Sequence, residues 1–292
     1  MCDQDSLDDM TDYEIRSAGL SRRQFGGALA GVGLASLLPA VAAARAVTGS
    51  DVNIETPDGT ADAYFVHPSE GAHSGVLMWP DVFGLRPAFK QMASRLATSG
   101  YSVLVVNPFY RSHRAPTSPP HPDFNDPTTR KALFALMSSL TPERIVTDAR
   151  AFIPWIERQP SVSGTRKMAT TGYCMGGPFT FRTAAAFPDS IGAGCSFHGA
   201  ELVTDRPDSP HRLIPEMKAQ FLVAIAANDD ERQPDAKTVL RDAFAKAHLY
   251  AEVAVYPGTL HGWCPIDSRV YNPKEAELAW SRQLALLERA LG

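Results

Sequence analysis

Gly172-Tyr173-Cys174-Met175-Gly176-Gly177 lies between a strand-like segment, residues 167–171, and an alanine-rich segment, residues 178–187, that suits a helix. A reactive side chain flanked by glycines at a turn from a strand to a helix is typical of a nucleophile elbow. The glycines permit a strained backbone at the nucleophile and close packing of the helix on the sheet. This stretch therefore predicts a nucleophilic thiol at Cys174.

Segments on both sides of the elbow alternate between strand and helix patterns. Continuous apolar runs are typical of strands buried on both faces. Alternating strands and helices predict a mostly parallel sheet with helices on both faces, which together with the elbow indicates one domain of the α/β-hydrolase fold. The predicted strands are 61–66, 75–79, 102–106, 167–171, 191–197, 221–226 and 251–256, and the predicted helices are 87–99, 141–158, 178–187, 235–248 and 274–291.

The composition is that of an ordinary soluble globular protein, with 292 residues of which 44% are hydrophobic and 21% charged. The formal net charge is −4, and no dense run of Lys or Arg occurs after the N-terminal segment. This charge balance argues against a nucleic-acid partner and against electrostatic membrane binding. The four cysteines, Cys2, Cys174, Cys195 and Cys264, match no metal-binding or disulfide pattern, and we expect neither a metal nor a cofactor.

The N-terminal segment has the parts of an export signal. Arg22 and Arg23 precede an uncharged run, residues 26–44, that ends in small residues with overlapping Ala-x-Ala cleavage sites. The arginine pair followed by Phe25 resembles a twin-arginine signal. The alternatives are an uncleaved anchor and a chance arginine pair, although the run is short and rich in Gly and Ala for a spanning helix. We therefore expect residues 1–46 to direct the domain 51–292 to the periplasm through the twin-arginine export machinery.

The acid and the base of the expected reaction should follow the elbow in that order along the chain. His261 lies in a loop just after the predicted strand 251–256, where the catalytic base of such hydrolases is found. Asp229 and Asp230 follow the preceding predicted strand. Asp230 is the predicted acid because Pro234 stands four residues further on, as in many such loops, and Asp229 is the alternative. The acid would hold the imidazole of His261 in the tautomer that catalysis needs.

The predicted nucleophile has neighbouring groups of two kinds. Some favour the thiolate form of Cys174, and others would bind the oxyanion that forms when it attacks a carbonyl. Pairing with His261 would favour the ionised form of Cys174, and the N-terminus of the following helix adds a favourable dipole. The backbone N–H of Met175 is predicted to form half of an oxyanion hole. We assign the other half to the N–H of Val82, in the loop after the predicted strand 75–79.

Four motifs in this order along the chain resemble the dienelactone hydrolase family. The similarity covers residues 51–291, which is almost the whole chain after the leader. The resemblance implies an α/β-hydrolase fold, a Cys-His-Asp triad and cofactor-free hydrolysis of a lactone or ester. The motifs are Asp81-Val82-Phe83-Gly84, Asn107-Pro108-Phe109-Tyr110-Arg111, the elbow 172–177, and His261-Gly262-Trp263.

The same resemblance implies roles for two charged residues in substrate binding. Asp81 takes the place of an acidic residue, usually Glu, that contacts the resting thiol in members of the family. Arg111 matches an arginine that binds the substrate carboxylate. A second such arginine is expected soon after the catalytic His, but residues 261–265 contain none, and Arg269 does not align with it. This departure argues against dienelactone itself as the substrate.

Two further residues have a predicted place near the site, and two cysteines are expected away from it. His198 follows the predicted strand 191–197 at the edge where the site should lie, and we assign it to the pocket lining, with a structural role as the alternative. Trp263 follows the base and is assigned to a wall of the pocket, with packing as the alternative. Cys195 and Cys264 are expected to be small buried residues, which an exported protein could join in a disulfide.

The leading hypothesis is an exported hydrolase that cleaves a small ester or lactone through a thioester formed on Cys174. The first alternative is a non-catalytic ligand-binding protein of the same fold. The second is an acyl-transfer or thiol-redox role, against which the absence of a Cys-x-x-Cys motif argues.

Overall fold

The computed structural model describes residues 45–118 and 126–292. All but the last two residues of the predicted export signal lie outside these ranges, as does part of the proline-rich stretch between Ser112 and Pro127. Among the helices of the described ranges, none combines the length and the apolar character that crossing a membrane requires.

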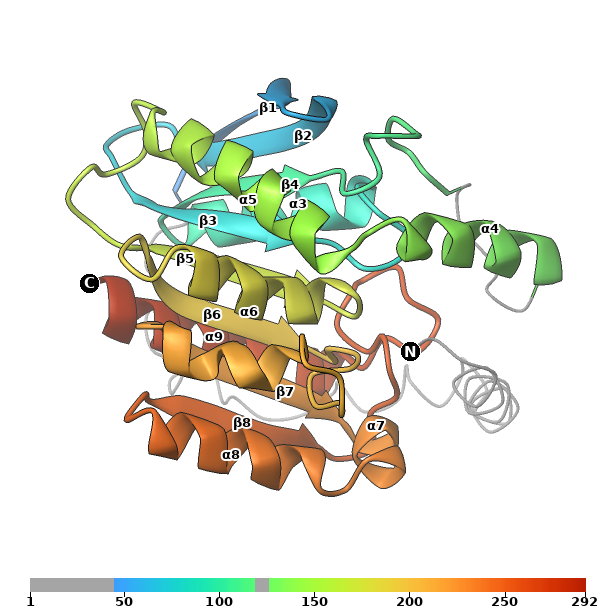
Figure 1. Cartoon of the computed structure of the whole chain (residues 1–292). Helices are drawn as coiled ribbons and strands as arrows, with labels where there is room; N and C mark the ends of the chain where they lie inside the picture. Colours follow the sequence, from blue (N-terminus) through green and yellow to red (C-terminus); the bar gives the residue numbers. More distant parts are fainter. Residues whose placement is uncertain (1–44, 119–125) are drawn as a thin grey trace, which may run out of the picture.

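An eight-stranded sheet forms the centre of the described domain (Figure 1). Its strand order is β1-β2-β4-β3-β5-β6-β7-β8, with parallel pairing from β4 onward and an antiparallel β1–β2 hairpin at one edge. The strands are β1 (Val47–Thr56), β2 (Gly59–Pro68), β3 (Ser74–Trp79), β4 (Tyr101–Val106), β5 (Met168–Tyr173), β6 (Ile191–Phe197), β7 (Gln220–Ala226) and β8 (Ala251–Tyr256).

Helices cover both faces of this sheet, so it has two apolar cores. One face is covered by α3 (Pro87–Thr98) and α9 (Pro273–Leu291), and the other by α5 (Pro142–Glu157), α6 (Gly176–Ala186) and α8 (Ala236–Lys246), which lie in front in Figure 1. The central strands have no polar face, because helices bury them on both sides. The predicted fold class is confirmed, and each predicted strand and helix is present with small shifts at its ends.

Four elements of the described ranges were not predicted, and one of them is the short 3-10 helix η1 (Pro210–Glu216) between β6 and β7. The edge strand β1 is mostly exposed and carries no apolar run, and it begins at Val47, ahead of the expected domain start at residue 51. Helix α4 (Pro127–Ser138) begins at the end of the proline-rich stretch, where Asp126 accepts a hydrogen bond from the N–H of Thr129 at 2.7 Å. Helix α7 (Ala227–Arg232) is a single short helix directly after β7. Of these elements, α7 lies at the carboxyl end of β7, on the edge of the parallel strands where α/β folds bind ligands.

Candidate active site

The turn from β5 into α6 forms a strained elbow at Cys174. The backbone of Cys174 has φ 53, in the left-handed region that a residue with a side chain rarely occupies. Glycine is required beside it because a Cβ on Gly176 would lie 2.5 Å from the Trp79 carbonyl oxygen, and one on Gly177 would collide with the Cα of Gly199. The thiol is thereby placed at the N-terminal end of α6, where the helix dipole favours a negative charge.

Asp229, and not Asp230, is the carboxylate beside the candidate base. Nδ1 of His261 lies 2.8 Å from Oδ2 of Asp229. Asp230 instead binds Lys237, whose Nζ is 2.7 Å from both carboxylate oxygens. The prediction of Asp230 as the partner of His261 was therefore wrong, because the segment is the helix α7 rather than the expected loop and turns its neighbouring side chains in different directions.

The imidazole of His261 is buried in an environment that favours its charged form. Burial lowers the pKa of His261, but the charge of Asp229 and the interaction with Cys174 raise it by more, so the pKa reaches about 10. An imidazolium at neutral pH can stabilise a thiolate on Cys174 and can later donate its proton to a leaving group.

Asn228 positions the same histidine through the backbone, a role that sequence reasoning missed. Its Oδ1 accepts a hydrogen bond from the backbone N–H of His261 at 2.9 Å. Consecutive residues of α7 thus hold the ring and the main chain of the histidine. The feature of the sequence that could have indicated this role is an Asn directly before two aspartates at the end of a predicted strand.

The two backbone groups predicted to form an oxyanion hole lie at neighbouring strand ends. Val82 follows β3, and Met175 follows β5, which pairs with β3 through Trp79 and Gly172. In the described ranges, the N–H groups of Val82 and Met175 donate no hydrogen bond to another backbone or side-chain group. Both are therefore available to a developing oxyanion.

Asp81, the predicted partner of the thiol, accepts hydrogen bonds from Arg86 on both of its carboxylate oxygens. The guanidinium of Arg86 donates to Asp81 at 2.6 and 2.9 Å, and its other edge binds Asp267 at 2.7 and 2.9 Å. Arg86 thereby ties the loop after β3, which contains Val82, to the loop that follows His261. Sequence gave no sign of this link, since its two aspartates are far apart along the chain.

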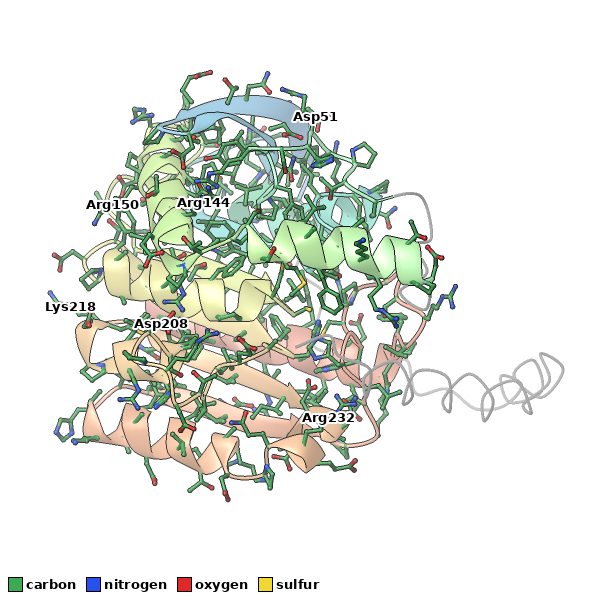
Figure 2. All side chains as sticks on the ribbon, turned by 45° about the vertical axis from the view of Figure 1, so that its right-hand side comes forward. Asp51, Arg144, Arg150, Asp208, Lys218 and Arg232 are labelled. Carbon is green, nitrogen blue, oxygen red and sulfur yellow. The ribbon has the colours of Figure 1, made fainter. Side chains whose placement is uncertain are left out.

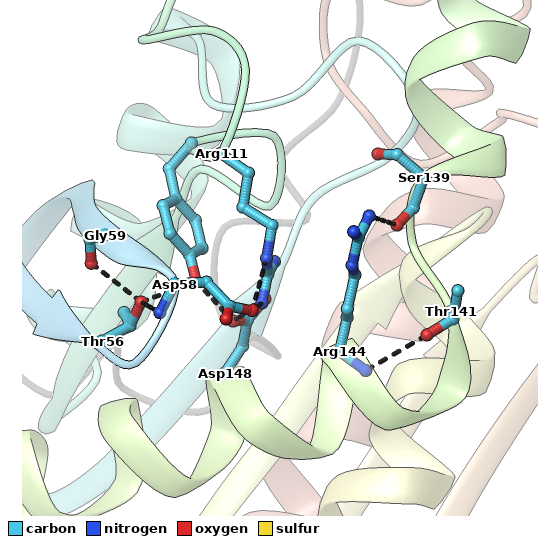
Figure 3. A network of polar contacts seen from close by, with 9 residues as sticks. Thr56, Asp58, Gly59, Arg111, Ser139, Thr141, Arg144 and Asp148 are labelled. Carbon is cyan, nitrogen blue, oxygen red and sulfur yellow. Dashed lines mark hydrogen bonds and ion pairs between the residues drawn. The ribbon is translucent and has the colours of Figure 1, made fainter.

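Arg111 also differs from its predicted role. Figure 3 shows its guanidinium between Asp58, in the turn of the β1–β2 hairpin, and Asp148 of α5. Asp148 is fully buried and also accepts a hydrogen bond from the Tyr110 hydroxyl at 2.8 Å. All three nitrogens of Arg111 donate to these two carboxylates, so it is engaged within the protein rather than presented to a substrate carboxylate.

His198 and Trp263 are buried, and the ring of His198 contacts those of both His261 and Trp263. The His198 ring meets that of His261 edge to face at 5.1 Å between centroids, and neither of its nitrogens has a hydrogen-bond partner in the described part of the chain. Burial and the neighbouring His261 lower the pKa of His198 well below its ordinary value, so this ring is neutral. Trp263 has no exposed surface and packs against Tyr256, so its assignment to a pocket wall was wrong.

Cys174, Cys195 and Cys264 are all buried, and no disulfide joins any two of them. Burial raises the pKa of both the Cys195 and the Cys264 thiol. Within the described ranges these two residues do not form the disulfide that an exported protein could have contained, and burial is the cause of the raised pKa of each thiol. Among the described residues, no cluster of three His, Cys, Asp or Glu side chains could hold a metal ion.

Comparison with known protein families agrees with the geometry of the site. The model of the dienelactone hydrolase family matches residues 61–291. The chain belongs to the dienelactone hydrolase family. Members of this family are hydrolases that act on ester or lactone bonds.

Individual relatives of this dienelactone hydrolase family member are distant in sequence. A carboxymethylenebutenolidase of Pseudomonas putida is 24% identical over 237 residues, which are 81% of this chain and 94% of the relative. A candidate carboxymethylenebutenolidase of Salmonella typhi is 24% identical over 245 residues, 82% of this chain and 86% of the relative. The crystal structure of a candidate dienelactone hydrolase from Klebsiella pneumoniae superposes with a TM-score of 0.72 at 23% identity, covering 84% of this chain and all of the other.

A cavity of about 690 Å³ adjoins the elbow of this family member at Met175. It lies between α4, the first turn of α5, the first turns of α6 and the loop after β6. Figure 2 shows α4, α5 and α6 on the same side of the molecule, with Asp208 labelled below them. A space of this size suits a small organic ligand.

Proposed function

We propose that this protein hydrolyses a small ester or lactone through Cys174, His261 and Asp229. The Cys174 thiolate attacks the carbonyl carbon, and the N–H groups of Val82 and Met175 bind the resulting oxyanion. The carbon–oxygen bond of the ester then breaks, and the His261 imidazolium gives its proton to the departing alkoxide. The product of this half-reaction is a thioester on Cys174.

Water completes the proposed cycle. His261, now neutral, accepts a proton from the water molecule that attacks the thioester carbonyl. The carbon–sulfur bond breaks, the acid is released, and the thiolate and the imidazolium are restored. Asp229 holds the ring through Nδ1 during both proton transfers and stabilises its charged form.

The observation that supports this proposal most strongly is the hydrogen bond of 2.8 Å between His261 and Asp229 beside a thiol on a strained elbow. A buried histidine with a raised pKa, a carboxylate partner and an adjacent nucleophile is an arrangement found at catalytic sites. The thiols of Cys195 and Cys264 have no such surroundings.

Replacement of the nucleophile tests the proposal. We expect Cys174→Ala to lower kcat/KM for p-nitrophenyl acetate by at least about a thousandfold, because no other group can form the acyl-enzyme. Mass spectrometry of the wild-type protein, quenched during turnover, should show one added acetyl group on the peptide that contains Cys174. The matched control is Cys195→Ala, which should keep its activity.

Two outcomes would contradict the proposed mechanism. Full activity of Cys174→Ala would rule out covalent catalysis by this thiol. A wild-type protein that binds esters without turning them over would favour the non-catalytic alternative.

We also propose that residues 1–46 export the folded domain to the periplasm. The support is the arginine pair Arg22-Arg23, the uncharged run behind it and the small residues before Val47. In a bacterial host with a twin-arginine pathway, the wild-type protein should appear in the periplasmic fraction, and an Arg22→Lys, Arg23→Lys double variant should remain in the cytoplasm. Equal periplasmic amounts of the two proteins would refute this route.

A further inference from the structure

Arg86 and Arg111 are each neutralised by two carboxylates of this chain. Arg111 binds both Asp58 and Asp148, and its guanidinium lies over the ring of Tyr110. Arg86 binds both Asp81 and Asp267. A substrate carboxylate could use either arginine only by displacing an internal carboxylate, and one of these, Asp148, is fully buried.

The cavity beside Met175 has mainly apolar walls. Helix α4 contributes Phe134 and Met137, and the short connection to α5 contributes Leu140; all three are only partly buried. Helix α5 contributes Ile145, and α6 contributes Phe179. Apolar walls favour the transfer of an apolar group from water at about 25 cal/mol per Å² of buried surface.

The two arginines in the cavity lining are paired within the protein as well. Arg182 donates to the Asp208 carbonyl at 2.9 Å and lies 3.6 Å from the carboxylate of the same residue. Arg206 lies 3.3 Å from Asp208 and 3.4 Å from Glu201. Two positive and two negative side chains therefore form one neutral group at the edge of the cavity. Among the described residues that line the cavity, both cations are therefore already paired, and neither is left to receive an added carboxylate.

We infer that the natural ester carries an uncharged, apolar acyl group that lies in this cavity, and that the site selects against acyl groups with a free carboxylate. The inference rests on the proposed function, since it assigns the acyl side of the thioester formed on Cys174. Met175 connects the cavity to the reaction, because this residue lines the cavity and its N–H belongs to the predicted oxyanion hole. Selection follows from the cost of removing an unpaired carboxylate from water, which apolar walls do not offset.

Three p-nitrophenyl esters of equal acyl length test this selection on the full-length protein. They are the hexanoate, the monoester of adipate, and the mixed diester of adipate with methanol, in which the carboxylate is masked. We expect kcat/KM for the hexanoate to exceed that for the adipate monoester by at least about thirtyfold. Masking the carboxylate should restore most of the loss, which separates the effect of charge from that of size.

Variants on the two sides of α4 locate the selection in the cavity. Met137→Arg places a cation in the wall and should raise the ratio of adipate to hexanoate hydrolysis by about tenfold through a charge-assisted hydrogen bond. Ala135→Arg adds the same charge to an exposed position of the same helix that does not line the cavity, and should leave the ratio unchanged.

The outcomes distinguish this inference from the proposed function. Equal or faster hydrolysis of the adipate monoester by the wild-type protein, still abolished by Cys174→Ala, would overturn the inference and leave the mechanism standing. Equal responses to Met137→Arg and Ala135→Arg would also overturn it. Hydrolysis of none of the three esters would count against the mechanism itself.

Discussion

At the scale of single residues, the electrostatics of the site depend on which of two neighbouring aspartates faces the imidazole. Successive residues of a helix point about 100° apart, so only one of the pair can meet His261. Asp229 does so, and Asp230 faces Lys237 instead. The charge of Asp229 is the largest cause that raises the pKa of His261 against the opposing effect of burial. Of these two aspartates, only Asp229 should therefore affect the reactivity of the Cys174 thiol.

Replacing each aspartate by Asn separates these roles. In the wild-type protein, the imidazolium loses its proton only as the pH rises through about 10, so the thiolate stays paired and the alkylation rate of Cys174 should be nearly constant between about pH 7 and 9. Asp229→Asn lowers the pKa of His261, removes imidazolium at neutral pH, and should slow alkylation by iodoacetamide at pH 7 by at least about tenfold.

The measurement is the rate at which the peptide containing Cys174 gains the mass of the alkyl group. Alkylation of Cys195 or Cys264 is therefore not counted. Asp230→Asn is the matched control and should keep the flat profile of the wild-type protein. If the alkylation rate rose steeply with pH in Asp230→Asn but not in Asp229→Asn, the assignment of Asp229 as the partner of His261 would be contradicted.

At the scale of elements, Arg111 joins three parts of the fold that are far apart along the chain. It connects the turn of the β1–β2 hairpin, through Asp58, to α5, through Asp148, while itself following β4 (Figure 3). The edge strand β1 has little apolar surface to bury, so such polar links matter for its position. The two possible roles of Arg111 predict opposite effects of its replacement. Loss of a substrate-binding arginine would lower activity, whereas loss of an arginine that joins elements would lower stability.

Arg111→Met tests which role applies. Its removal leaves the buried carboxylate of Asp148 without its cation, so we expect the free energy of unfolding to fall by about 3–5 kcal/mol. Urea denaturation measures this change. The folded variant should hydrolyse p-nitrophenyl hexanoate at nearly the wild-type rate, because Arg111 is engaged away from the substrate.

A nearby arginine provides the control for this substitution. Arg114 is exposed and binds Asn53 at 2.8 Å, so Arg114→Met should change stability by less than about 0.5 kcal/mol. If Arg111→Met kept wild-type stability and lost only its activity toward adipate monoesters, Arg111 would be a substrate-binding residue after all.

At the scale of the whole molecule, the sequence predicts what local patterns determine and misses what distant contacts determine. Apolar runs such as β3 are strands because they are buried on both faces, and the elbow at Cys174 follows from its own glycines. The partners of Asp81 and Arg111 come from segments brought together only by folding, so no local pattern reveals them. The choice between Asp229 and Asp230 depended on the rotation of α7, a helix too short to show a periodic pattern.

The cavity wall formed by α4 has a consequence for how this protein can change over evolutionary time. Only Leu133 and Leu136 of α4 are buried, whereas the elbow is fixed by backbone atoms in contact. Mutations in the cavity-facing residues of α4 can therefore accumulate without disturbing the sheet or the elbow. A lineage built on this domain can acquire new substrates while its reaction stays the same, and natural variation should concentrate in α4.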